Sequence, residues 1–279
     1  MEHVMELTML NGFRATLVGE EKSKATVDKY LRDLETFYRF AGGKVITKEL
    51  VIRYKQELVE RYAPASVNSM LAAINCFFKE QGWYDCVVKS LKIQRQSFRE
   101  KERELTKAEY FRLLQAAKER GNTRLYVLMQ TMCATGIRVS EVRFITMEAV
   151  RRGRATVSLK GKIRQVLLPA DLCRELKRYA KEQGIRAGQL FVTKSGKPLD
   201  RSNILHEMKA LCKTAGVERT KVFPHNLRHL FACLYYKVSK DLSRLADVLG
   251  HTNVNTTRIY TCVSGMEHVR QLERLGLVI

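Results

Sequence analysis

Residues 224–228, Pro-His-Asn-Leu-Arg, pair two side chains that could bind a phosphate. Proline favours the first turn of a helix, so this stretch predicts a helix start. At about 100° per residue, His225 and Arg228 lie opposite the apolar face of Leu227, turned away from the core. An imidazole and a guanidinium held together there could both grip one phosphate. Taken alone, the fragment also fits an ordinary solvated helix face.

A second stretch holds a histidine just beyond the end of a predicted helix. The apolar periodicity stops at Leu249, and Gly250 suits the left-handed position that follows a last helical turn. His251 therefore has a defined place past a rigid terminus. Nine residues later, in the predicted helical segment Asn255–Thr261, lies Tyr260, and a single tyrosine in such a segment usually serves packing.

A third stretch, Ala-Thr-Gly-Ile-Arg-Val-Ser-Glu at 134–141, places an arginine at a junction between helices. We expect an apolar helix to end at Gly136 and a second helix to begin with Ser140 and Glu141 near its start. Arg138 lies between them, where free backbone N–H groups also favour anions. All three stretches therefore suit an anion such as phosphate.

In order and spacing, these motifs resemble the tyrosine recombinase (phage integrase) family. The resemblance rests on A-T-G-I-R-V-S-E, then H-N-L-R-H at 225–229, then L-G-H at 249–251, then Tyr260. The separations of 23 residues from Arg228 to His251 and of 9 more to Tyr260 also fit the family pattern. The resemblance covers the second domain closely, whereas the first is only generically similar to the family's helical core-binding domain.

The resemblance implies that Tyr260 attacks a DNA phosphodiester, forms a 3′-phosphotyrosyl link and releases a 5′-hydroxyl. Arg138 and Arg228 would clamp the non-bridging oxygens, and His251 would add a hydrogen bond. These roles make chemical sense, because fixed guanidinium groups stabilise the charge on a phosphoryl group in transfer. A phenol, with a pKa near ~10, also needs cationic surroundings or a nearby base to ionise at neutral pH.

Two further implied roles fall on a histidine and a lysine. His225 would take part in proton transfer, and a lysine in a predicted hairpin turn would protonate the leaving oxygen. Lys160 and Lys162 both lie in that turn; Lys160 matches the family's K-G turn better, and Lys162 is the alternative. His229 is expected to be structural or to contact phosphate, and Leu230 departs from the Ser or Thr that often follows this histidine in the family.

We predict no metal and no other cofactor. Around the motifs there is no carboxylate cluster of the kind that holds Mg²⁺, and the chain has no Walker-type phosphate loop. Its seven cysteines are scattered without a C-x-x-C pair, so we expect buried reduced thiols rather than disulfides or a zinc site.

The charge of the chain points to double-stranded DNA as its partner. The formal net charge is +21, and +18 of it lies in residues 101–279. Residues 151–164 contain no acidic residue, and such a run favours a phosphate backbone because each neutralised phosphate releases counterions. Beside the candidate lysine Lys160, we expect this run to supply five DNA-binding residues: Arg151, Arg152, Arg154, Lys162 and Arg164.

A length of 279 residues with few glycines and prolines favours two largely helical domains. Apolar side chains at helical spacing predict a helical core-binding bundle over 1–95, followed by a charged linker over 96–104. The catalytic domain would cover 105–279, opening with a capping box formed by Thr106 and Glu109. Alternating apolar residues predict strands at Ala155–Leu159 and Ile163–Pro169, with a short third strand at Gln189–Thr193. The fold class is therefore mainly α with a small antiparallel β-sheet.

Several functions fit this sequence, and the favoured one is a site-specific recombinase or integrase. A type IB topoisomerase uses similar chemistry, and a non-catalytic DNA-binding regulator is a third alternative. Recombination needs a synapse, so we expect a tetramer on two DNA sites, with a last helix near 265–275 that docks on its own or a neighbouring protomer. No apolar run reaches the ~20 residues that span a bilayer, and no secretion signal is visible, so we predict a cytoplasmic protein without membrane contact.

Overall fold

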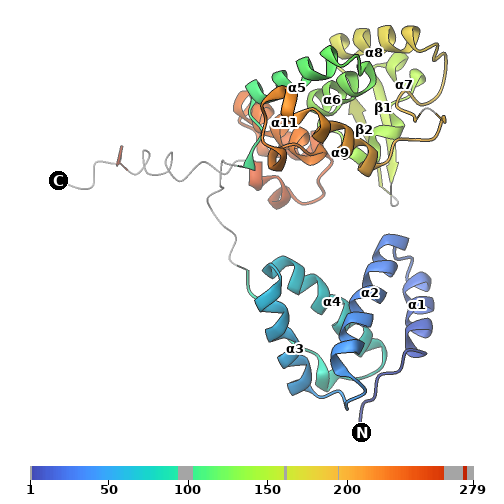
Figure 1. Ribbon diagram of the computed structural model, residues 1–279, viewed down its shortest axis with the longest axis vertical. Helices are drawn as coiled ribbons and strands as arrows, with labels where there is room; N and C mark the ends of the chain where they lie inside the picture. Colours follow the sequence, from blue (N-terminus) through green and yellow to red (C-terminus); the bar gives the residue numbers. More distant parts are fainter. Residues whose placement is uncertain (1, 94–102, 160–161, 194, 261–272, 275–279) are drawn as a thin grey trace. The chain divides into compact units, whose positions relative to one another are not determined.

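A computed structural model describes residues 2–93, 103–159, 162–193, 195–260 and 273–274, with only the backbone of Lys162. The chain divides into two compact units, Met1–Arg95 and Gln96–Ile279. Figure 1 shows the first unit in blue to teal and the second in green to red. Both are mainly helical, and the described strands form one two-stranded antiparallel sheet, so the predicted fold class is confirmed.

The first unit is a helical bundle closed by a short 3-10 turn. Its elements are α1 (Met9–Gly19), α2 (Lys24–Ala41), α3 (Lys48–Arg61), α4 (Pro64–Glu80) and η1 (Tyr84–Cys86). The hydroxyls of Ser23 and Thr47 accept N–H bonds at the starts of α2 and α3, which satisfies donors that a helix start leaves free. The predicted apolar stripes line one core, joined by α1, which the sequence pattern did not predict.

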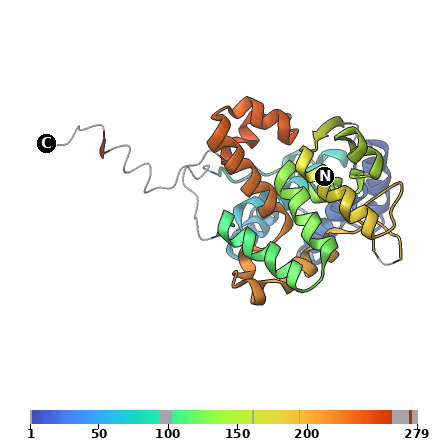
Figure 2. The same cartoon turned by 90° about the horizontal axis from the view of Figure 1, so that it is seen from above.

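The second unit is built around α6 (Thr123–Thr135), a helix that is apolar on most sides. Helices α5 (Lys107–Glu119), α8 (Ala170–Glu182), α9 (Arg201–Ala210) and α11 (Pro224–Ser239) all pack against it. A helix covered on several faces needs apolar residues around most of its circumference, and α6 has them. Helix α11, orange in Figure 2, packs directly on α6, which is green.

The remaining elements of the second unit are short and lie around this framework. They are η3 (Val139–Phe144), α7 (Met147–Arg152), β1 (Arg154–Leu159), β2 (Lys162–Leu167), α10 (Cys212–Ala215), η4 (Arg219–Lys221), α12 (Leu242–Leu249), η5 (Val254–Thr256) and η6 (Arg258–Tyr260). The capping box of Thr106 and Glu109 at the start of α5 is confirmed. A small apolar cluster of Ala232, Leu245, Leu249 and Tyr260 joins α11, α12 and η6.

The hairpin β1–β2 alternates between a buried and an exposed face. Ala155 pairs with Val166, and both are buried, whereas Ile163 and Leu167 are 75% and 71% exposed. Residues directly opposite each other in an antiparallel pair lie on the same face of the sheet. The face of Ala155 and Val166 is therefore the one that packs on the core.

Of three further local expectations, one is confirmed, one is wrong and one lies almost wholly outside the described residues. The second helix expected after Arg138 is present as a 3-10 helix, Val139–Phe144. Residues 189–193 form no strand; Gln189 and Val192 make only isolated bridges, to Thr146 and Pro198. The predicted last helix near 265–275 falls almost wholly outside the described residues.

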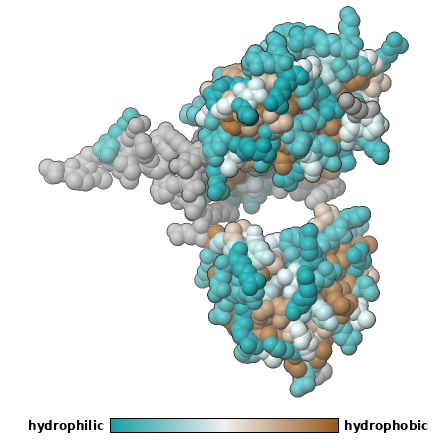
Figure 3. Space-filling view, viewed as in Figure 1, coloured by the Kyte–Doolittle hydropathy of each residue, from teal (hydrophilic) through white to brown (hydrophobic). Residues whose placement is uncertain are grey.

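The second unit has a mainly hydrophilic face, and the described cysteines of the chain are reduced. On the face seen in Figure 3, the second unit is mainly hydrophilic, whereas apolar atoms gather on the first. The described cysteines are free thiols, as expected; Cys86, Cys173 and Cys212 are buried, whereas Cys76, Cys133 and Cys233 are only partly buried. Across the described residues, no helix is long and apolar enough to cross a bilayer.

Gly136, which ends α6, is predicted to tolerate alanine poorly. Its φ is +61°, and a Cβ there would lie 2.7 Å from Cε1 of Phe231 on α11. Gly153 is the matched control, because its φ is +67° but a Cβ there meets nothing within 4 Å. In urea denaturation we expect Gly136→Ala to lose about 1–3 kcal/mol more stability than Gly153→Ala. Equal losses would mean that backbone strain alone, and not the contact between α6 and α11, matters.

Candidate active site

A pocket of about 460 Å³ in the second unit gathers most of the chemically capable side chains. It is lined by Ile137, Arg138, Val139, Ser140, Arg201, Pro224, His225, Arg228, His251, Thr256, Ile259 and Tyr260. It is formed by the residues just after α6 and just after α12, by the start of α11 and by the segment η5–η6. Residues separated by more than a hundred positions in the sequence therefore meet in one place.

Arg228 lies in the interior behind this pocket, only 2% exposed. Its Nη1 donates to the carbonyl of Gly136, and its Nη2 donates to the carbonyl of Leu249 (2.9 Å) and contacts Nε2 of His251 (2.9 Å). Burial, followed by repulsion from Arg138, lowers the pKa of Arg228 to about 10. It still carries its charge at neutral pH, and in the described residues none of its hydrogen bonds goes to a carboxylate.

Three guanidinium groups converge on the end of α12. Arg164 donates to the carbonyl of Val248 (3.1 Å), Arg228 to that of Leu249 (2.9 Å) and Arg138 to that of Gly250 (3.2 Å). The last carbonyls of a helix have no partner inside it, and the helix dipole makes that end attractive to cations. These three consecutive carbonyls, called here the α12 terminus, therefore hold three arginines that come from different elements.

Glu141 links two of these arginines. Its Oε1 accepts from Nη1 of Arg138 (2.9 Å), and its Oε2 accepts from the Arg138 backbone N–H (2.9 Å) and from Nη2 of Arg164 (2.5 Å). Burial opposes the charge of Glu141, which is 3% exposed, but the hydrogen bonds from Arg164 and Arg138 outweigh it and lower its pKa. The carboxylate stays ionised and fixes the conformation of Arg138, whose side chain remains 38% exposed.

His251 is held as a neutral imidazole with a defined tautomer. Burial, followed by the charges of Arg228 and Arg138, lowers the pKa of His251 to about 4. A guanidinium can only donate, so Nε2 of His251 accepts from Arg228. Its Nδ1 therefore carries the proton and donates to Oγ1 of Thr257 (2.9 Å).

Tyr260 lies against two histidine rings. It is 5% exposed, its ring stacks on that of His251 (centroids 6.2 Å apart, 14° between planes), and it tilts against His229 (5.1 Å, 54°). His229 is itself 2% exposed and within 3.7 Å of the thiol of Cys233, which gives it a packing role. Tyr260 is thus part of the small apolar cluster and of the pocket wall at once.

Five of the six predicted catalytic residues line this pocket: Arg138, His225, Arg228, His251 and Tyr260. Lys160 lies outside the described residues, as does the side chain of Lys162. The expectation that Arg228 turns away from the core is wrong, because α11 is covered on that side by the ends of α6 and α12. His225, one turn earlier, is exposed at the pocket rim.

The predicted DNA-binding arginines fall into two groups. Arg151, Arg152 and Arg154 are exposed around the end of α7 and the start of β1, away from the pocket lining. The side chain of Arg164 is 15% exposed; it forms an ion pair with Glu141 and donates to the Val248 carbonyl of the α12 terminus.

Sequence reasoning missed Arg201, an exposed residue at the first position of α9 that lines the pocket. In the described part of the chain its side chain makes no hydrogen bond or ion pair. Its neighbour Asp200 is a clear helix cap, so the start of α9 was predictable, but nothing local indicated which pocket that helix start faces.

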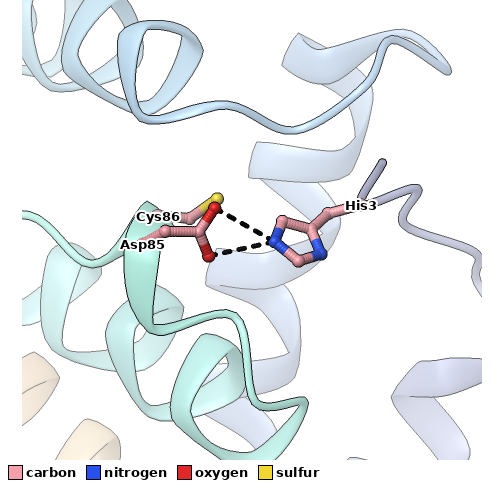
Figure 4. A group of neighbouring side chains, drawn as sticks. All are labelled: His3, Asp85 and Cys86. Atoms are coloured by element: carbon pink, nitrogen blue, oxygen red, sulfur yellow. Dashed lines mark hydrogen bonds and ion pairs between the residues drawn. The ribbon is translucent and has the colours of Figure 1, made fainter. Parts of the chain in front are cut away.

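Within the described residues, one group of three side chains has atoms close enough to ligate a metal: His3, Asp85 and Cys86, within 4.8 Å of one another. Each is already engaged. Nε2 of His3 bonds both carboxylate oxygens of Asp85 (2.9 and 3.1 Å; Figure 4), and its ring stacks on Trp83. The Cys86 thiol donates to the carbonyl of Ile46, and burial raises its pKa to about 11. The group therefore serves to fasten the N-terminal segment to η1.

Two family models match the chain: the phage integrase family over residues 103–266, and the phage integrase N-terminal SAM-like domain over residues 10–83. The chain belongs to the phage integrase family. The resemblance drawn from its motifs is thereby confirmed.

Curated relatives of similar length are tyrosine recombinases. XerA of Pyrococcus furiosus is 27% identical over 288 residues, covering 99% of this chain and 97% of the relative. XerD of Xanthomonas campestris pv. campestris is 31% identical, covering 90% and 85%. A solved lambda integrase tetramer bound to a Holliday junction has a similar fold, with a TM-score of 0.75 at 17% identity over 93% of this chain and 77% of that one. This phage integrase family member is an enzyme of the tyrosine recombinase class, which cleaves and rejoins DNA.

We expect protonation of His251 to destabilise the second unit. Its pKa in the folded protein, about 4, lies below its ordinary value of 6.5, so the unfolded chain binds more protons between these values. The contribution of His251 is thus present above pH ~6.5 and is lost as the pH falls towards 4. Thermal melts from pH 7.5 to 4.5 should show a steeper loss of Tm in the wild type than in His251→Gln, and parallel curves would contradict this.

Proposed function

We propose that this recombinase cuts DNA by attack of Tyr260 on one phosphodiester, forming a 3′-phosphotyrosyl intermediate and freeing a 5′-hydroxyl. The bond to the tyrosine keeps the energy of the phosphodiester, so rejoining to another strand needs no nucleotide. The observation that carries the proposal is the shared pocket of Arg138, Arg228, His251 and Tyr260.

Arg138 and Arg228 are assigned to the non-bridging oxygens of the scissile phosphate. Arg228 supports this assignment because it is buried and charged without a carboxylate partner among the described residues. A buried cation of this kind is costly until an anion approaches, and a phosphate supplies that anion. The donors are fixed in advance by the α12 terminus, so little reorganisation is needed when charge develops on the oxygens.

His251, His225 and Lys160 are assigned to hydrogen bonding and proton transfer. His251 accepts from Arg228 in the free protein, and an arriving phosphate would favour its protonated, donating form because an anion raises a nearby histidine's pKa. His225 at the pocket rim is the candidate for proton transfer with Tyr260. Lys160, with Lys162 as the alternative, is assigned as the acid that protonates the leaving 5′-oxygen. This assignment rests on the family resemblance.

Double-stranded DNA is the proposed substrate, held by the basic surface as well as the pocket. Arg151, Arg152 and Arg154 are exposed and suited to backbone phosphates, as Lys162 is by its type. Arg201, unpaired among the described residues, is added as a contact to a phosphate next to the scissile one. We assign residues 1–95 to core binding and 105–279 to catalysis, joined by a linker at 96–104.

Recombination is favoured over the two alternatives. Relatives matched over nearly the whole chain are named tyrosine recombinases, which speaks against a type IB topoisomerase. The five predicted catalytic residues that the structure describes all line one pocket, which speaks against a non-catalytic regulator.

Because lambda integrase has been solved as a tetramer on a Holliday junction, we propose a tetrameric synapse on two DNA sites here as well. Because its substrate is DNA, we also propose that it works in the cytoplasm.

Tyr260→Phe should abolish covalent capture of DNA and leave binding nearly unchanged, because one hydroxyl is removed and the ring packing is kept. The assay is trapping on a nicked half-site DNA, resolved on a denaturing gel, with affinity measured by fluorescence anisotropy. Tyr235→Phe, on α11 and outside the pocket lining, is the matched control and should still form the adduct. Adduct formation by Tyr260→Phe would refute the assignment of the nucleophile.

Arg201→Ala should weaken DNA binding and reduce the slope of log Kd against log salt by about one, as expected for one lost phosphate contact. Cleavage at saturating DNA should change little. Arg174→Ala, on the exposed face of α8 and paired with Asp171, is the control and should leave the slope unchanged. An unchanged slope in Arg201→Ala would remove Arg201 from the interface.

A further inference from the structure

Arg164 lies on the inward face of the β1–β2 hairpin. It pairs with Val157, which is 2% exposed, and opposite residues of an antiparallel pair share a face. Its neighbour Ile163 points the other way and is 75% exposed. The basic run at 151–164 therefore divides by strand alternation, and Arg164 belongs to its inward part.

The Arg164 side chain joins three elements. From β2, its Nη2 and Nε reach the carboxylate of Glu141 on η3 (2.5 and 3.4 Å), and its Nη1 reaches the carbonyl of Val248 on α12 (3.1 Å). It passes so close to Gly250 that a Cβ there would lie 2.9 Å from Nε of Arg164 and closer still to Cδ. Gly250 is thus needed both for its φ of +64° and for this passage.

Together these bonds close a ring beside the pocket, and Arg138 is the member of the ring that lines it. Arg164 binds Glu141, Glu141 binds Arg138, Arg138 binds the carbonyl of Gly250, and Arg164 binds the carbonyl of Val248 on the same terminus. Arg164 is absent from the pocket lining, so we expect it to act on a phosphate through Arg138, which does line the pocket.

Charge gives Arg164 a second effect. Arg138 and Glu141 alone would form a neutral pair, and the carboxylate would cancel much of the attraction of Arg138 for a phosphate. With Arg164 the group of three carries one net positive charge. Arg164 thus supports Arg138 through their common partner Glu141. Removing a supporting residue of this kind usually lowers activity by about 10–100-fold, as removing the hydrogen-bond partners of metal ligands does.

We propose that Arg164 is a positioning residue for strand cleavage, one that sets the orientation and the net charge of Arg138 and fixes the β1–β2 hairpin against the α12 terminus. This inference rests on the proposed function. It replaces the expectation that Arg164 binds DNA directly.

The test compares Arg164→Met and Arg164→Lys with Arg174→Met. Arg174 lies on the exposed face of α8, paired with Asp171, so its loss should leave both DNA binding and cleavage unchanged. At saturating nicked DNA, Arg164→Met should cut the single-turnover rate of adduct formation about 10–100-fold while Kd and its salt slope stay near wild type. Arg164→Lys keeps the charge and should recover part of the lost rate.

Two results would overturn the proposal. One is a change in Kd and salt slope with an unchanged rate at saturation, which would make Arg164 a DNA contact. The other is equal loss in Arg164→Lys and Arg164→Met when both melt like the wild type, which would remove the charge effect. Failure of the proposed function itself would be seen separately, as a wild type that forms no adduct.

The pH profile gives a readout that loss of packing would not move. In the described residues the charged groups facing Glu141 are Arg138, Arg164 and, farther away, Arg228. Loss of Arg164 removes the strongest influence that lowers the pKa of Glu141. The acid limb of the cleavage profile should therefore shift to higher pH in Arg164→Met and less in Arg164→Lys, and an unshifted limb in Arg164→Met would count against the proposal.

Discussion

The arrangement of the second unit depends on the free carbonyls at the end of α12. Three consecutive carbonyls, of Val248, Leu249 and Gly250, each accept from a different arginine, and a helix end with these groups unsatisfied would be costly in the interior. The arginines start from β2, α11 and the segment after α6, so one helix terminus brings these elements together. The result is a basin of positive charge in which, among the described residues, the one carboxylate bonded to these arginines, that of Glu141, offsets only part of their charge.

Close approach at two glycines makes this convergence possible. Gly136 ends α6 where Phe231 of α11 passes, and Gly250 ends α12 where Arg164 passes, both with positive φ. A side chain at Gly136 would push against Phe231 of α11, the helix that carries Arg228, and one at Gly250 would displace the side chain of Arg164. Donors held in this way are oriented before substrate arrives, which is how a protein stabilises charge that develops during phosphoryl transfer without reorganising at that moment. Tyr260 reaches the same place through the small apolar cluster that it forms with α11 and α12.

Much of this could be predicted from the sequence, because helix periodicity, caps and motif spacing are local signals. The capping box at Thr106, the glycine end of α12 and the β1–β2 hairpin follow directly from such patterns. The burial of Arg228 could not be predicted, because a helical wheel shows which side a residue faces but not what covers that side. In a strand, Arg164 shares a face with Val166, so its inward orientation could have been predicted. The basic residues around it favoured a surface position instead. Arg201 had no local signal, since only the tertiary fold turns the start of α9 towards the pocket.

The most direct test of the account is to identify the residue that becomes linked to DNA. After trapping on nicked DNA, nuclease and trypsin digestion should leave a nucleotide on the peptide of residues 259–270, whose only tyrosine is Tyr260. The account predicts that fragmentation places a 3′-phosphate on this tyrosine and that the released strand carries a 5′-hydroxyl. A nucleotide on any other peptide, or a 5′-phosphoryl link, would contradict it.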